Sequence, residues 1–174
     1  MLKYFKKNQT IEDKLYNKIL SLSRNKLFYT KLGLSDTFQN RIILIFLHIS
    51  FLFIKTKTNE SNSFYKTFYQ KMFNFVFDKI ELNMREIGYG DMTVNKNMKT
   101  LVKRFYNILL NCEIYQKKNM DNKVAFFIKY LQLSHNKESD INIKLVGYFD
   151  KYQAFCFDLR ADSVLRGELN FEYI

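Results

Sequence analysis

The chain has 174 residues, the size of one domain, and its apolar content of 47% is enough to fill a core. That content excludes a disordered protein. The absence of proline and the presence of only five glycines disfavour a sandwich or barrel, so we predict an all-α protein. We expect residues 1–174 to form a single compact bundle of about six to seven helices. The net charge of +11 favours an anionic partner, and only two cysteines, Cys112 and Cys156, exclude a disulfide scaffold.

Helix caps and apolar periodicity place the elements along the chain. Thr10 begins a capping box and opens the first helix, and Gly33 stops the second. Ser35 or Asp36 caps the third, and Gly147 indicates a close helix contact. The expected helices cover residues 10–23, 26–32, 36–55, 63–87, 95–118, 121–133 and 140–159, and the tail from residue 162 forms a short irregular or helical cap.

The third expected helix is the most apolar part of the chain. Between residues 42 and 54 only His48 and Ser50 interrupt the apolar run. A membrane-spanning helix needs roughly 20 apolar residues, whereas a shorter helix that is apolar all round is typical of the centre of a bundle. We therefore expect this helix to be buried and His48 to be a hydrogen-bonded core residue.

The helix expected over residues 63–87 has two apolar faces. The broader face, which ends at Ile87, suits the core. The second face carries Phe64, Phe68, Phe75 and Leu82. A helix of this kind lies between two layers or leaves one face for a partner. Burial is favoured, but this second face is the best candidate in the chain for a groove that binds a client protein.

The next helix carries a basic row opposite its core face. Lys96, Lys99 and Lys103 recur at positions i, i+3 and i+7, so they share one side of the helix. Such a row could meet phosphates or an acidic partner. A solvated helix face is the alternative.

No motif for catalysis or metal binding is recognisable. His48 and His135 lie far apart, and no pair of cysteines and histidines has the spacing of a zinc site. Gly88 and Gly90 are too few for a dinucleotide fingerprint and follow a helix rather than a strand. Both cysteines fall on inward helix faces, where packing is the expected role. The sequence predicts a protein that is not an enzyme and needs no cofactor or metal.

Two segments of the chain carry a recognisable motif. The first covers residues 32–37 with Arg41 and His48, and the second runs from residue 84 to 106 and contains R-E-x-G-x-G-D. Together they resemble the ubiquinol–cytochrome c chaperone family, whose members assist the assembly of respiratory complex III. The resemblance covers about residues 20–160. The residues that match the family pattern are Asp36, Arg41, His48, Arg85, Glu86, Gly88, Gly90 and Asp91. Ser35 and Asn95 stand where the family usually has proline, which affects the rigidity of two turns.

The resemblance implies an all-α, non-catalytic chaperone that binds newly made cytochrome b. Family members in mitochondria work with a small partner assembly factor near the ribosomal exit tunnel. Since no transit peptide precedes the domain, we expect a bacterial cytoplasmic protein at the inner membrane, the alternative being the matrix side of the mitochondrial inner membrane. In this family the charged motif residues are expected to fix caps and turns more than to touch a client, and an approach of His48 to haem is a minor alternative.

Two other functions are open at the level of sequence. The chain could be a basic all-α module that binds RNA or the ribosome, whose affinity would fall steeply with salt. It could instead be a peripheral membrane protein, whose binding to vesicles would increase with anionic lipid. DNA is not an expected partner.

Overall fold

The computed structural model describes residues 9–57, 63–133 and 138–173, and within these ranges the regular elements are helical. A single bridge between Leu34 and Leu133 is the exception in the described part of the chain. The elements are α1 (Ile11–Ser23), α2 (Lys26–Thr30), α3 (Phe38–Lys57), α4 (Ser63–Glu86), α5 (Asp91–Glu113), the 3-10 turn η1 (Tyr115–Lys117), α6 (Met120–Tyr130), α7 (Glu138–Asp158) and α8 (Ala161–Leu165). The predicted all-α class is confirmed.

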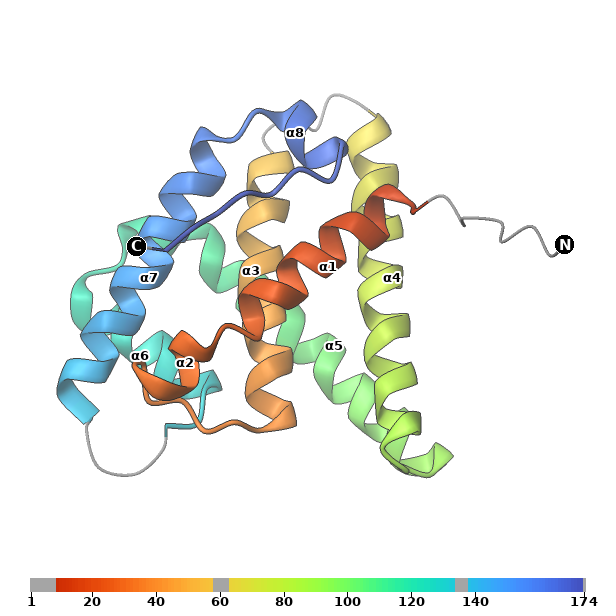
Figure 1. Cartoon of the computed structure of the whole chain (residues 1–174), viewed down its shortest axis with the longest axis horizontal. Coiled ribbons are helices and arrows are strands. Elements are labelled where there is room, and N and C mark those ends of the chain that lie inside the picture. The colour runs from red at the N-terminus through yellow and green to blue at the C-terminus, as the bar shows by residue number, and fades with distance from the viewer. Residues whose placement is uncertain (1–8, 58–62, 134–137, 174) are drawn as a thin grey trace, which may run out of the picture.

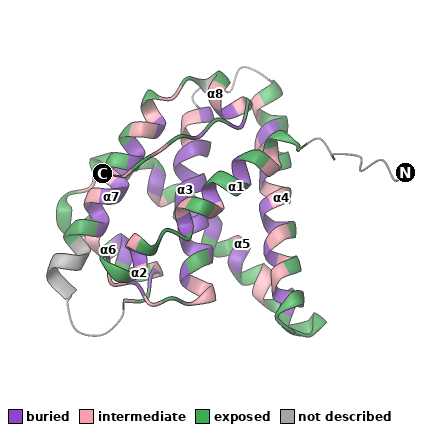
Figure 2. Ribbon diagram, in the orientation of Figure 1, coloured by how far each residue is buried: buried purple, intermediate pink, exposed green. Residues whose placement is uncertain are grey.

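The apolar helix α3 forms the centre of the bundle. In Figure 1, α4 and α7 stand on either side of it and α1 crosses in front. It contacts α1, α4, α5, α7 and α8. Every residue from 42 to 53 is buried, and the turns of α3 that are visible in Figure 2 are largely in the buried colour. By length and composition alone α3 could cross a membrane, but 72% of its apolar window is buried inside the protein, as expected for the central helix of a bundle.

The capping residues predicted from the sequence are correct for α1 and wrong for α3. Thr10 Oγ1 accepts the N–H of Asp13 at 3.2 Å, so the predicted cap of α1 is confirmed. The predicted cap of α3 is wrong, because Thr37 Oγ1 accepts the N–H of Asn40 instead. The chain remains non-helical through Ser35 and Asp36, where Asn40 binds the carbonyl of Ser35 at 2.7 Å.

Helix α5 begins four residues before the predicted start at Asn95. Gly90 occupies its N-cap position without a side-chain hydrogen bond, so no cap signal marks this start in the sequence. Gly88 has a φ of +95°, a conformation that glycine adopts easily and that ends α4. The chain therefore reverses direction between α4 and α5 within a few residues. Asp91 lies in the first turn of α5, where its negative charge interacts favourably with the helix dipole.

The C-terminal segment packs back across the bundle. Gly167 has a φ of +72° and lies so close to α1 that an added Cβ would be 3.0 Å from Lys14 Cβ. Phe171 contacts Tyr152, with ring centroids 5.1 Å apart. Gly147 does not make the close helix contact predicted from the sequence, since no atom of a neighbouring helix lies within 4 Å of the Cβ position there.

Candidate functional site

The first group of motif residues holds the start of α3. The guanidinium of Arg41 donates to both carboxylate oxygens of Asp36, at 2.8 and 2.9 Å. This ion pair lowers the pKa of Asp36, mainly through the hydrogen bond from Arg41. Both side chains are about half exposed. Their arrangement fixes the chain that enters α3.

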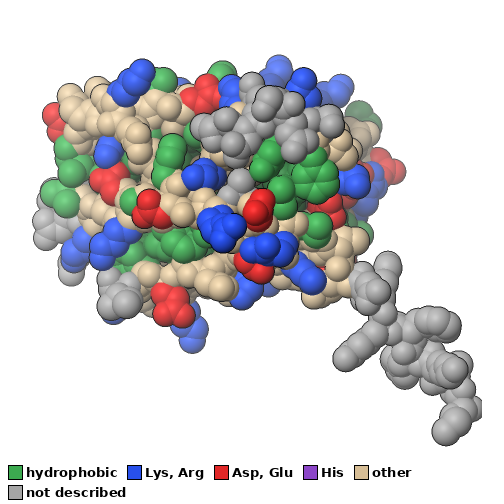
Figure 3. All heavy atoms as spheres, turned by 90° about the horizontal axis from the view of Figure 1, so that it is seen from above, with side chains coloured by type: hydrophobic (Ala, Val, Ile, Leu, Met, Phe, Trp, Pro, Cys, Tyr) green, Lys and Arg blue, Asp and Glu red, His purple; other side chains and the backbone are tan. Residues whose placement is uncertain are grey.

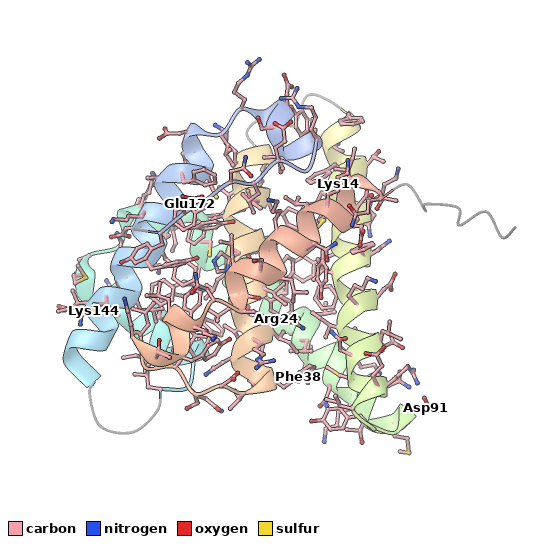
Figure 4. All side chains as sticks on the ribbon, viewed as in Figure 1. Lys14, Arg24, Phe38, Asp91, Lys144 and Glu172 are labelled. Carbon is pink, nitrogen blue, oxygen red and sulfur yellow. The ribbon has the colours of Figure 1, made fainter. Side chains whose placement is uncertain are left out.

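The second group of motif residues holds the turn between α4 and α5. Arg85 donates to Glu81 Oε1 at 2.9 Å, one turn earlier in α4, and also to Asp91 in the first turn of α5. These bonds raise the pKa of Arg85. Figure 4 places Asp91 at the far end of this turn, at the edge of the molecule. Glu86 is exposed beside the turn.

Around this braced turn the surface is apolar. Met92 is 88% exposed and Ile87 is 55% exposed, and Leu82 and Tyr89 are also exposed. The sequence prediction that Ile87 faces the core is wrong, because the α4 residues that pack inward end with Met84. Sequence reasoning also missed Met92, since the late predicted start of α5 left it in a loop. We call Leu82, Ile87, Tyr89 and Met92 the turn patch.

The turn patch continues along the outward side of α5. At 100° per residue the exposed residues on this side lie opposite the buried stripe that contains Leu101 and Phe105. We call this set the α5 outer face; it comprises Met92, Lys96, Lys99, Lys103, Tyr106, Leu110 and Ile114. The predicted lysine row is thus exposed, with apolar side chains at both ends. Within the described residues no carboxylate forms an ion pair with these three lysines.

Comparison with known proteins identifies the family. Residues 30–171 match the family model described as ubiquinol-cytochrome C chaperone. The chain belongs to the ubiquinol-cytochrome C chaperone family. Among solved structures, the chain is similar to the Cbp3 homolog from Brucella abortus, with a TM-score of 0.79 and 20% identity over 94% of this chain and 89% of that one. At this identity the likeness shows a shared fold. A search of curated proteins found no significant match.

The family match agrees with the resemblance seen in the sequence. The structure shows what several of the motif residues contact. Asp36, Arg41, Arg85 and Asp91 brace two helix starts, and Gly88 allows the reversal between α4 and α5. The turn patch and the start of the α5 outer face lie at the turn that Arg85 and Asp91 brace. This chain therefore displays apolar and basic side chains together along α5.

The second apolar face of α4 is not a continuous open groove. Phe68 is only 5% exposed and Phe75 is partly buried against Tyr16 of α1, with ring centroids 5.7 Å apart. Phe64 and Leu82, at the two ends, remain exposed. Because α1 packs across the middle of α4, the predicted client-binding set Phe64, Phe68, Phe75 and Leu82 does not form one surface.

His48 is a buried core residue with both ring nitrogens hydrogen-bonded. Its Nδ1 lies 2.6 Å from the carbonyl oxygen of Leu44, which can only accept, so Nδ1 carries the proton. Nε2 therefore accepts from the hydroxyl of Tyr148 at 2.8 Å. Burial lowers the pKa of His48 to about 4, so the ring is neutral near pH 7. With both nitrogens occupied inside the core, His48 has no free position for a haem iron.

The cysteines and acidic residues form no reactive or metal-binding cluster in the described ranges. Cys112 and Cys156 are buried, and desolvation raises the pKa of the Cys156 thiol to about 12. Within residues 9–57, 63–133 and 138–173, no group of three histidine, cysteine, aspartate or glutamate side chains could hold a metal ion. His135 lies outside the described residues.

Proposed function

We propose that this protein is a non-catalytic assembly chaperone for ubiquinol–cytochrome c reductase, complex III, and that it holds newly made cytochrome b. Family membership supports a role in complex III assembly. The observation that carries the client assignment is the α5 outer face, on which Met92, Tyr106 and Leu110 are all exposed. Large exposed apolar patches mark sites of contact with proteins or membranes.

The size and chemistry of the α5 outer face suit a membrane-protein helix. Met92 and Ile114 are 22 residues apart, which corresponds to about 33 Å along a helix. The hydrocarbon core that a transmembrane helix crosses is about 30 Å thick. Methionine is flexible and polarisable and adapts to varied apolar partners. A newly made transmembrane helix could therefore lie along α5 with its apolar side chains covered.

The lysines on the same face add an attraction for anionic partners. Lys96, Lys99 and Lys103 lie between the apolar ends, and no described carboxylate neutralises them. We propose that they bring the protein to the anionic inner-membrane surface from the bacterial cytoplasm. A small partner assembly factor and the ribosome near its exit tunnel are further proposed partners.

Photocrosslinking from the α5 outer face tests the client assignment. A photoreactive amino acid at Leu110 should capture cytochrome b in cells, because this exposed position lies on the proposed client surface. The same group at Asn17, which is exposed on α1, is the matched control. Capture of cytochrome b from both positions, or from neither, would contradict a client surface on α5.

The lysine row also favours a second candidate function, a basic RNA- or ribosome-binding module without a membrane-protein client. An RNA contact would weaken steeply with salt and would not depend on the apolar residues. If replacing Met92 and Leu110 with serine left ribosome binding unchanged while complex III assembled normally, this second function would be favoured.

A further inference from the structure

Two hollows lie side by side on the flank of α5, away from the α5 outer face. One, of about 310 Å³, is lined by the start of α3, the α4–α5 turn and α5. The other, of about 360 Å³, is lined by α5 and the end of α6. Gln39 and Arg104 line both hollows, which therefore adjoin each other. We call the two hollows together the Arg104 trough.

The Arg104 trough is positively charged and contains no acidic group. Arg104 and Lys129 line it, and no aspartate or glutamate does. Arg104 forms no ion pair with any carboxylate in the described ranges. Four other arginines do form such pairs: Arg41, Arg85, Arg160 and Arg166. An exposed guanidinium at the centre of a hollow without a counter-charge favours a bound carboxylate or other anion.

Two buried polar atoms beside Arg104 also lack a partner. Gln39 Nε2 and the hydroxyl of Tyr130 are buried without a hydrogen bond to the described residues, and both residues line the trough. A buried polar group left unpaired costs about 1–3 kcal/mol, and native proteins keep few of them. Both groups can donate, and a rotation of either side chain toward the trough would let a ligand rich in acceptors satisfy it.

Each hollow also has apolar side chains in its lining, which favours a peptide over a simple anion. Ile42 and Leu101 line the first hollow, and Ile128 and Leu131 line the second. Asn97 of α5 lines the first hollow and Asn107 lines the second. They are ten positions apart, or about 15 Å along the helix. An extended chain of about five residues spans this length. In such a segment alternate side chains face the same side.

We infer that the Arg104 trough docks an extended segment of a partner protein with a central aspartate or glutamate. Apolar side chains two positions before and after the acidic residue fill the two hollows. The acidic side chain pairs with Arg104, and Gln39 and Tyr130 donate to main-chain carbonyls of the segment. A phosphate group or RNA backbone would satisfy Arg104 but make no use of the apolar side chains in the two hollows. This site is separate from the α5 outer face, so it does not depend on the proposed client.

Selection from a peptide library tests the inference. A random dodecapeptide library bound to the full chain should yield an acidic residue with apolar residues two positions away on each side. For the best such peptide, Arg104→Gln should weaken affinity by about 10-fold or more, because a charged hydrogen-bonded pair is lost. Replacing the acidic peptide residue with its amide should cause a similar loss. Arg24→Gln removes an exposed charge elsewhere and should leave affinity unchanged.

A second variant separates binding from folding. Gln39→Met removes a buried donor that lacks a partner, so the melting temperature should stay the same or rise while peptide affinity falls. A lower melting temperature with unchanged affinity would assign Gln39 to the fold and overturn the inference. The inference is also overturned if no acidic consensus is selected, if Arg104→Gln binds the peptide normally, or if single-stranded RNA or anionic vesicles displace it through Arg104.

Discussion

At the scale of single residues, buried polar side chains join segments that are far apart in the chain. The side chain of Asn40 donates to the carbonyl of Gln132 at 2.7 Å and accepts its N–H at 2.8 Å. Tyr148 similarly donates to His48. The sequence indicated that His48 is a satisfied core residue, which is confirmed. It could not name the partners, because each is about a hundred positions away and no local pattern encodes such a contact.

The buried His48 predicts a specific loss of stability in acid. Its pKa is about 4 in the folded protein and about 6.5 in an unfolded chain, so the unfolded state binds the proton more readily. The neutral ring therefore contributes stability that is complete above pH 6.5 and is lost as the pH falls toward 4. At pH 5 the free energy of unfolding should be lower than at pH 7.5 by about 2 kcal/mol.

Urea unfolding at the two pH values measures this difference. His48→Gln removes the titrating ring, so the variant should lose less stability between pH 7.5 and pH 5 than the wild type. An equal loss in both proteins would show that other groups, rather than His48, cause the acid sensitivity.

At the scale of helices, the packing of α1 against α4 decides whether the second apolar face of α4 is exposed, which periodicity alone could not predict. The two apolar faces of α4 were visible in the sequence, but whether the second was covered depended on a helix about fifty residues earlier. Helix α3 needed no such information, since it is apolar all round and suits only a buried position in the bundle. The start of α5 was misplaced because Gly90 provides no side-chain cap.

Charged substitutions on α4 should therefore distinguish covered from exposed residues. Phe68→Asp with Phe75→Asp places one charge at a buried position and one against Tyr16 of α1, and should lower the free energy of unfolding by more than about 4 kcal/mol. The control pair Phe64→Asp with Leu82→Asp changes exposed residues and should remain folded. Thermal unfolding followed by circular dichroism gives both values. A folded Phe68/Phe75 variant would contradict the packing of α1 on α4.

For the lysine row on α5 we expect a loss of function without a loss of stability. Charge reversal at Lys96, Lys99 and Lys103 changes exposed side chains, so the free energy of unfolding should change by less than about 1 kcal/mol. Assembly of complex III should nevertheless decrease, because the basic part of the α5 outer face is reversed. Native gel electrophoresis of membranes measures the assembled complex. Unchanged assembly in this folded triple variant would remove the lysine row from the proposed function.

At the scale of the whole molecule, one helical framework supports separate surfaces. Aligned to the Brucella abortus Cbp3 homolog, the chain keeps the fold at 20% identity. In Figure 3 lysine and arginine side chains lie among acidic and apolar ones on the face seen from above. Composition predicted the fold class, and the motifs predicted the family. The turn patch and the Arg104 trough required the packed structure, because each combines residues from different helices.

We propose above all that the protein holds cytochrome b through the α5 outer face during complex III assembly. A reduced-minus-oxidised difference spectrum of membranes from cells that lack the gene tests it most directly. We predict loss of the complex III cytochrome b signal with other cytochromes retained, rescue by the wild-type gene, and no rescue by a folded Met92→Asp, Leu110→Asp variant. A normal cytochrome b signal in cells without the gene, with normal complex III, would contradict the claim.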